Sequence, residues 1–235
     1  MAIVLLDDEL PSLFPDPSTA DPTGLLAVSK TLGEQRLIAA YQHGIFPWMK
    51  IPEDPFFWCW YSPDPRMLLY PGEFKISRSL HKVLKEERFD VRIDQAYSEV
   101  MKACADAPRP NQESTWIHKD MQIDYTKLHN LGIAHSIEAY EQDELVGGLY
   151  GLALGRAFFG ESMFHRKPEA SKVCMARLVE IAKEAGFLFI DCQVPNPFLH
   201  SLGAREVTRN KFLHQLREAH PEQPSPAHWL SLSKK

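Results

Sequence analysis

The sequence predicts an α+β fold built around a mixed β-sheet. Two apolar, glycine-punctuated runs, residues 145–154 and 157–164, meet at Gly155-Arg156, which is typical of a β-hairpin. A helix expected over residues 169–185 ends at Gly186 and leads directly into the apolar run 187–190. A strand that follows a helix in this way returns to the sheet by a helical crossover, so antiparallel and parallel pairs are both expected.

The other segments divide the chain into a small N-terminal domain, residues 1–66, and a larger domain, residues 67–235. In the first domain, early prolines predict an extended arm, and the apolar spacing of residues 33–44 predicts a short helix. A proline-rich aromatic stretch follows, with Trp48 expected on a loop. The larger domain is expected to contain helices over 77–87, 94–105, 119–131 and 208–219 and strands over 89–93 and 133–140.

Composition restricts the function classes. The 235 residues are 44% hydrophobic and 24% charged, which is typical of a soluble globular protein with a substantial core. We see neither a signal peptide nor a run of roughly 18 apolar residues, and we therefore expect a cytoplasmic protein with no membrane partner. The net charge of −5 argues against broad coating of nucleic acid but allows a local basic patch. The cysteines are scattered, which favours reduced thiols over disulfides or a metal site.

The best candidate site lies at the carboxyl end of the strand over residues 187–190. Glu161 is an anion within the second hairpin run, where a buried carboxylate costs several kcal/mol unless it is paired or lies in a cleft. Side chains alternate along a strand, so Asp191 and Gln193 are expected to point to the same side. In open sheets with helical crossovers, ligands bind at that end of the strands. A strand-end cap is the alternative interpretation of this pair.

A stripe of cations marks the helix expected over residues 77–87. Arg78, Lys82 and Lys85 fall at i, i+4 and i+7 and therefore share one helical face. Most such stripes are solvated surface, whereas in a chain of net negative charge a phosphate-binding footprint is the alternative. Trp48 is suited to stacking on a planar ring, although aromatic residues also seal small cores.

The order of elements resembles the layout of the acyl-CoA N-acetyltransferases (GNAT type). Those enzymes hold the coenzyme pyrophosphate on a glycine-rich turn that precedes the long helix. Here the corresponding link, residues 165–170, reads HRKPEA and contains no glycine, so a backbone nest for pyrophosphate is hard to form. We therefore expect a GNAT-like mixed-sheet domain without a CoA site.

Eleven short sequence motifs follow one another along the chain between residues 24 and 204. They are GLLA (24–27), AYQHGIFPW (40–48), YSPDPR (61–66), ISRS (76–79), TWI (115–117), AHSIE (134–138), LVGGLYG (145–151), GESMF (160–164), ASK (170–172), DCQVPN (191–196) and SLGA (201–204). Together they resemble the leucyl/phenylalanyl-tRNA–protein transferases of bacteria. One such motif would carry little weight, but this many in order cover most of the chain.

The resemblance implies a specific reaction. Such an enzyme transfers Leu or Phe, and also Met, from aminoacyl-tRNA to the N-terminal α-amino group of proteins that begin with Arg or Lys. The product is marked for degradation by the N-end rule. The resemblance also implies no metal and no other cofactor, and a small N-terminal domain followed by an acetyltransferase-type domain. Nothing in the sequence demands more than a monomer.

The resemblance further implies roles for individual residues. The catalytic group comprises Asp191, which orients Gln193, together with Glu161 and Asn196. The pocket for the donor side chain comprises residues that periodicity alone would place in the core, namely Leu149, Phe158, Met175, Leu178 and Ile190. Trp48 and Trp116 correspond to aromatics that stack around the terminal adenosine. The stripe of Arg78, Lys82 and Lys85 corresponds to a basic helix that meets the acceptor stem.

Two stretches depart from the family pattern. Ser29-Lys30-Thr31-Leu32 replaces the usual Gly-Gly-Asp-Leu, and Phe198 stands where a His is common. The second change borders the expected site and is expected to alter donor or acceptor preference. Two other functions remain open from the sequence, namely a CoA-dependent N-acetyltransferase and a non-catalytic tRNA- or degron-binding module.

Overall fold

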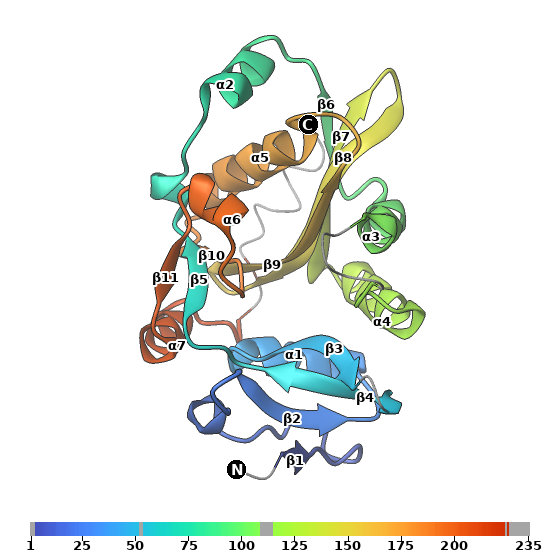
Figure 1. Ribbon diagram of the computed structural model, residues 1–235, viewed down its shortest axis with the longest axis vertical. Helices are drawn as coiled ribbons and strands as arrows, with labels where there is room; N and C mark the ends of the chain where they lie inside the picture. Colours follow the sequence, from blue (N-terminus) through green and yellow to red (C-terminus); the bar gives the residue numbers. More distant parts are fainter. Residues whose placement is uncertain (1–2, 52–53, 109–114, 224, 226–235) are drawn as a thin grey trace.

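The computed structural model describes residues 3–51, 54–108, 115–223 and 225, which form two β-sheets (Figure 1). The N-terminal sheet has the strand order β1-β2-β4-β3. Its strands are β1 (Val4–Leu5), β2 (Leu25–Ser29), β3 (Phe46–Ile51) and β4 (Asp54–Tyr61). The 3-10 helix η1 (Pro17–Thr19) precedes β2, and helix α1 (Glu34–Gln42) follows it, as expected from the apolar spacing.

The second sheet has the strand order β11-β5-β10-β9-β8-β7-β6. Its strands are β5 (Arg66–Leu69), β6 (Asp90–Ile93), β7 (Ala134–Glu141), β8 (Glu144–Leu154), β9 (Ala157–His165), β10 (Phe189–Asp191) and β11 (Arg205–Val207). The accompanying helices are η2 (Pro71–Glu73), α2 (Arg78–Lys85), α3 (Tyr97–Asp106), α4 (Lys119–Asn130), α5 (Ala170–Glu184), α6 (Pro197–Ser201) and α7 (Arg209–Glu218).

The pairing confirms the mixed sheet. β8 and β9 form the expected antiparallel hairpin, and β10 pairs parallel with β9 after the crossover through α5. Figure 1 shows α5 on one face of the sheet and α3 and α4 on the other, so the central strands are covered on both sides. The predicted α+β class with a mixed sheet is therefore confirmed.

Because both faces of the sheet are covered, polar residues of its central strands are buried as well. Ser136 and Glu138 on β7 are both fully buried, and the Ser136 hydroxyl donates to Glu138 Oε1 over 2.5 Å. Burial raises the pKa of Glu138 to about 7. The alternation along this strand therefore separates two packed layers rather than core from solvent.

The structure corrects the expected place of Trp48. It lies in β3 rather than on a loop, and β3 pairs with β4, which carries the aromatic run. Pro47 is compatible with a strand here because β3 is an edge of the N-terminal sheet and its outer side needs no backbone donor. The early arm is likewise not wholly irregular, because β1 pairs parallel with β2.

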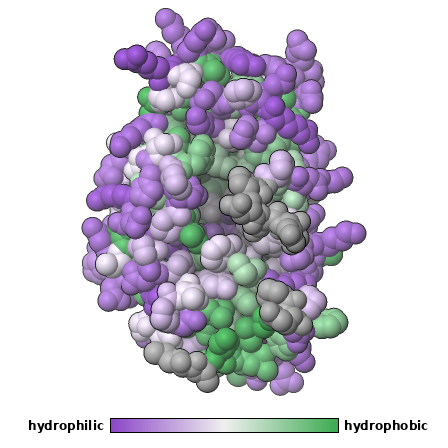
Figure 2. All heavy atoms as spheres, viewed as in Figure 1, coloured by the Kyte–Doolittle hydropathy of each residue, from purple (hydrophilic) through white to green (hydrophobic). Residues whose placement is uncertain are grey.

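Besides the strands of the N-terminal sheet and the two 3-10 helices, the elements β5, α6 and β11 were absent from the sequence-based expectation. β5 begins at Arg66, the last residue of the expected N-terminal domain, and lies between β10 and β11. The unusual segment before α1 forms its own turn, in which the Ser29 hydroxyl donates to the Thr31 carbonyl over 2.7 Å. In the view of Figure 2, hydrophilic residues cover the upper end, where α2 lies, and hydrophobic residues gather lower down over the N-terminal sheet.

Candidate active site

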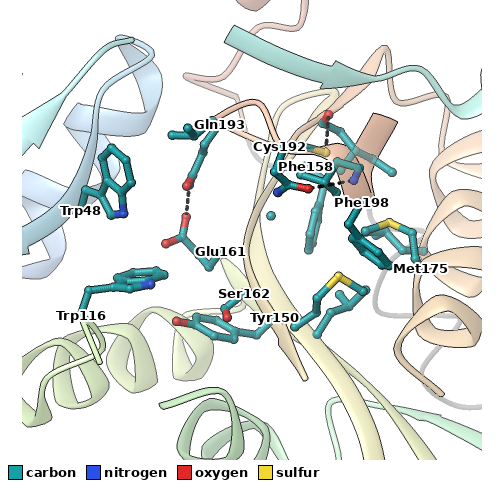
Figure 3. Close-up of a pocket in the computed structure, with 18 residues that line it drawn as sticks. Trp48, Trp116, Tyr150, Phe158, Glu161, Ser162, Met175, Cys192, Gln193 and Phe198 are labelled. Carbon is teal, nitrogen blue, oxygen red and sulfur yellow. Dashed lines mark hydrogen bonds between the residues drawn. The ribbon is translucent and has the colours of Figure 1, made fainter. Parts of the chain in front are cut away.

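The site opens where two neighbouring strands separate. β10 pairs with β9 from Phe189 opposite Ala157 to Asp191 opposite Phe159, and β9 then continues to His165 beyond the end of β10. A cavity of about 280 Å³ lies at this divergence, at the carboxyl end of β10 where ligands are expected. Figure 3 shows that its lining combines a polar centre, an apolar end and two tryptophans on the opposite side.

Glu161 and Gln193 form the polar centre of the pocket (Figure 3). Gln193 Nε2 donates to Glu161 Oε1 over 2.7 Å, and both residues are 8% exposed. A carboxylate can only accept hydrogen bonds, so it takes the amide nitrogen and leaves the amide oxygen available as an acceptor. Glu161 therefore fixes which way round the Gln193 amide is held.

Two buried tyrosines also hold Glu161. The Tyr41 hydroxyl on α1 donates to Oε1 over 2.7 Å, and the Tyr125 hydroxyl on α4 donates to Oε2 over 3.3 Å. Together with Gln193 they supply the donors that a buried carboxylate requires. Neither tyrosine is marked as functional by its sequence context, because each lies on a helix at a position typical of ordinary core. The site therefore combines a residue of the N-terminal part, Tyr41 on α1, with residues of the larger part that follows.

Burial raises the pKa of Glu161 to about 7, against hydrogen bonds from Tyr41, Gln193 and Tyr125 that lower it. The ordinary value is 4.5, so between these two values the folded state binds more protons than the unfolded state. The stability that this group contributes is therefore greatest below the window and is lost as the pH rises through it.

We expect Glu161→Gln to flatten this part of the stability profile. As the pH rises from about 5 to about 8, the wild-type protein should lose roughly 2–3 kcal/mol relative to the variant, because the amide does not ionise. Thermal unfolding followed by circular dichroism across this range measures the difference. Glu144→Gln, at an exposed position on β8, serves as the control and should leave the profile unchanged. Parallel curves for the wild type and Glu161→Gln would contradict the assignment.

Asp191 lies behind the pocket rather than in its lining. Its carboxylate forms a bidentate pair with Arg66, at 2.9 Å from Nε and 2.6 Å from the terminal nitrogen NH2, and both side chains are fully buried. The guanidinium lies 4.7 Å from the ring centre of Phe46 and 4.4 Å from that of Phe212. Arg66 was not among the site residues predicted from the sequence.

Asp191 acts on Gln193 through the backbone. Asp191 Oδ1 accepts the Gln193 N–H over 2.9 Å, and the Gln193 carbonyl accepts the Met67 N–H over 3.0 Å. Gln193 has a φ of 61°, in the left-handed region, so the strand alternation that predicted a common direction for the two side chains ends at Asp191. The structure therefore brings the pair together, but by a turn instead of a continued strand.

The remaining polar residue of the expected catalytic group is Asn196, which also lines the pocket. Its side-chain oxygen accepts the Leu199 N–H over 2.9 Å and caps α6. Phe198, the departure from the family pattern, lies in the first turn of the same helix, lines the pocket and is 38% exposed. Phe198 thus places an aromatic ring at the rim of the cavity.

The apolar end gathers every residue expected for the donor side chain. All five are at most 6% exposed and line the cavity, namely Leu149, Phe158, Met175, Leu178 and Ile190. Met163 and Leu199 line it as well and were not expected. From periodicity alone, these residues would be assigned to the packed core. They line a cavity because β9 and β10 separate beside them.

The two tryptophans lie across the pocket from this apolar end (Figure 3). Trp48 comes from β3 of the N-terminal sheet, where its ring packs edge-on against Tyr61 at 5.3 Å between centres. Trp116 comes from the segment before α4. Both tryptophans therefore lie beside the same cavity.

The cation stripe lies outside the pocket. Arg78, Lys82 and Lys85 are exposed on α2, which Ser77 caps by accepting the Leu80 N–H. Lys82 lies 3.8 Å from Glu86 in a solvent-exposed pair, which contributes little. Among the described residues, no group of three or more His, Cys, Asp or Glu is placed to hold a metal ion.

Comparison with known proteins extends from the site to the whole chain. Residues 68–217 match the family model described as leucyl/phenylalanyl-tRNA protein transferase, and residues 33–64 match the model of the N-terminal domain of these proteins. The chain belongs to the leucyl/phenylalanyl-tRNA–protein transferase family. Membership identifies it as an aminoacyltransferase, in agreement with the expectation from the short motifs.

Named relatives in this family match over nearly the full length. The leucyl/phenylalanyl-tRNA–protein transferase of Syntrophobacter fumaroxidans is 48% identical over 222 residues, covering 94% of this chain and 93% of the relative. That of Pseudomonas syringae pv. syringae is 52% identical over 209 residues, covering 89% of each. A solved GCN5-related N-acetyltransferase-like protein from Streptococcus suis aligns at a TM-score of 0.37 and 12% identity, over 77% of this chain and 68% of that one. Similarity this distant says nothing about the site.

The described helices also bear on the expectation about membranes. Among the described residues, no helix is both long enough and apolar enough to span a membrane.

Proposed function

We propose that this transferase moves Leu, Phe or Met from the 3′ end of aminoacyl-tRNA to the α-amino group of proteins that begin with Arg or Lys. The observation that carries the proposal is the Gln193 amide, oriented by Glu161 over 2.7 Å and set between an apolar cavity end and two tryptophans. An apolar donor side chain, a reacting ester and a planar base would then lie along one pocket.

The reaction is the aminolysis of an ester. The acceptor nitrogen attacks the ester carbonyl carbon, the peptide C–N bond forms, and the bond from that carbon to the ribose 3′-oxygen breaks. The ester is already activated, so catalysis mainly requires positioning of the amine. The Gln193 amide oxygen accepts a hydrogen bond from the amine and orients it. A neutral amide is too weak a base to keep the proton, which we assign to the leaving 3′-oxygen by way of the ribose 2′-hydroxyl.

Acceptor and donor choice follow from the two ends of the pocket. Among the described residues that line it, Glu161 is the single acid, so its charge favours an acceptor with a cationic first residue. The apolar end favours Leu and Phe over charged side chains. A pocket of this kind discriminates single methylene groups by only about 1–3 kcal/mol, which suits an enzyme that accepts more than one donor.

We assign the tRNA contacts to the tryptophans and to α2. Stacking of Trp48 and Trp116 on the terminal adenosine would contribute about 1–3 kcal/mol per base. The exposed cations of α2 would meet phosphates of the acceptor stem, and such contacts are blind to sequence and therefore compatible with several tRNAs.

Reversing the charge of α2 should weaken tRNA binding without slowing the chemical step. We expect Arg78→Glu combined with Lys82→Glu to raise the KM for charged tRNA by about 10-fold or more and to make the salt dependence of binding shallower. Steady-state transfer rates at several salt concentrations measure both effects. Lys211→Glu combined with Arg217→Glu on α7, where both cations are also exposed, is the matched control. A loss of kcat equal to the rise in KM would contradict the assignment.

The same proposal includes the biological role. Transfer of Leu or Phe to such proteins would mark them for degradation by the N-end rule, in the cytoplasm and by a monomeric enzyme. The four cysteines, three buried and one partly buried, form no disulfide with one another, which suits a reducing compartment.

The decisive experiment follows radiolabelled Phe and Leu from charged tRNA to a peptide that starts with Arg and to a matched peptide that starts with Ala. Label on the Arg peptide alone establishes both the reaction and the acceptor rule. Label on neither peptide, with tRNA still bound, would favour the non-catalytic binding module.

A CoA-dependent acetyltransferase is disfavoured by the start of α5. The residue before the helix is Glu169, with a φ of 70°, and its carboxylate accepts hydrogen bonds from Lys172 and Ser79. A carboxylate at this position would repel a pyrophosphate. Calorimetry with acetyl-CoA should therefore detect no binding.

A further inference from the structure

Three side chains outside the pocket join the N-terminal sheet to helix α4. Lys50 Nζ on β3 lies 2.7 Å from Asp120 Oδ2. The Trp58 indole nitrogen on β4 donates to the same oxygen over 3.2 Å, and Lys50 Nζ lies 4.8 Å from the centre of the Trp58 ring. Trp58 is 1% exposed, so part of this group is shielded from water. We refer to Lys50, Trp58 and Asp120 as the β3–α4 joint.

The joint lies close in the chain to both tryptophans of the pocket. Lys50 is two residues after Trp48 on β3, and Asp120 is four residues after Trp116, in the first turn of α4. The joint therefore ties the strand that carries one tryptophan to the helix that follows the other.

The strand needs such a tie because its register is irregular at Trp48. The pairing with β4 passes from Pro47 opposite Trp60 to Met49 opposite Cys59, which leaves Trp48 as the extra residue of a β-bulge. A bulge redirects a side chain and locally interrupts the ladder, so the bulged residue depends on neighbouring contacts for its position. Lys50 supplies one of these contacts immediately beyond the bulge.

We propose that the β3–α4 joint positions Trp48 relative to Trp116 and so sets the width of the slot that receives the planar adenine ring of the donor tRNA. This inference rests on the proposed function, in which both tryptophans contact that ring. Lys50, Trp58 and Asp120 do not line the cavity. They are positioning residues, and their loss should weaken donor binding while the chemical step at Gln193 continues.

Lys50→Met tests the inference, because it removes the charge and keeps most of the aliphatic stem. We expect the KM for phenylalanyl-tRNA to rise roughly five- to ten-fold with kcat changed less than about two-fold, the pattern of an interaction common to ground and transition states. Lys50→Arg keeps the positive charge that pairs with Asp120 and should therefore show the wild-type KM. The same loss should appear with phenylalanyl-adenosine, which lacks the acceptor stem, when its binding is followed by quenching of tryptophan fluorescence.

Lys127→Met is the matched control. Lys127 also links α4 to the N-terminal part, at 3.7 Å from Glu34, but toward the other end of the helix. Only Lys50→Met should raise the KM, and Lys127→Met should leave it at the wild-type value.

The outcomes separate this inference from the proposed function. A wild-type protein that transfers no label overturns the proposed function itself. Wild-type transfer together with an unchanged KM in Lys50→Met overturns the inference alone. An equal rise of the KM in Lys50→Met and Lys127→Met also overturns it, because the effect would then belong to the whole contact between the sheet and α4.

Discussion

Replacing Gln193 with alanine is expected to lower kcat for aminoacyl transfer roughly 100- to 1000-fold while the KM for charged tRNA stays within about three-fold. In the proposed mechanism the side chain supplies the acceptor that orients the attacking amine, whereas the apolar wall and the two tryptophans, which would hold the donor, remain in place. Single-turnover transfer of labelled Phe to an Arg peptide measures the chemical step directly.

Gln35→Ala, an exposed glutamine on α1, is the control and should transfer at the wild-type rate. Gln193→Asn separates the presence of an amide from its position, because it keeps the amide but withdraws it by one methylene from Glu161. We expect Gln193→Asn to resemble the alanine variant. A Gln193→Ala protein that transfers at the wild-type rate would remove Gln193 from the mechanism and favour another acceptor for the amine.

Asp191→Ala is expected to reduce the free energy of unfolding by about 3–5 kcal/mol. The reason is that the Arg66 guanidinium, fully buried and bound to both carboxylate oxygens, would be left without its counter-charge. Urea denaturation followed by tryptophan fluorescence measures the loss. A variant as stable as the wild type would show that the Arg66 charge has another partner.

A paired replacement distinguishes stability from catalysis at the same residue. Arg66→Met combined with Asp191→Leu exchanges the buried ion pair for apolar side chains, which often preserves stability. We expect it to recover much of the lost stability but little activity, since the Gln193 N–H would still lack the Asp191 oxygen that accepts it over 2.9 Å. Full recovery of both would reduce Asp191 to a partner of Arg66.

The parts of the fold that the sequence predicted are those determined by neighbouring residues. The hairpin of β8 and β9 follows from two apolar runs around Gly155, and α5 follows from apolar spacing that ends at Gly186. The grouping of Glu161, Asp191 and Gln193 in one candidate site was also predicted, because a charged residue in an apolar strand needs a partner or a cleft.

The parts that escaped prediction depend on contacts between distant residues. Arg66 and Asp191 are 125 positions apart, and Tyr41 and Glu161 are 120 apart, so no local pattern marks either pair. Trp48 looked like a loop residue because of the prolines around it, and only the edge position of β3 makes a strand possible there. The turn at Gln193 could not be predicted either, because no sequence rule assigns a left-handed φ to glutamine.

The backbone of Gln193 also bears on how this enzyme can change over generations. A non-glycine residue with a φ of 61° is held in a conformation that costs about 1 kcal/mol or more. Glycine would relieve that strain, and selection for stability alone would favour it at this position. A glutamine at this position therefore lowers stability relative to glycine, a cost that its proposed role in the transfer reaction would offset. Consensus-style thermostabilisation of this protein should leave position 193 untouched and look for its gains elsewhere.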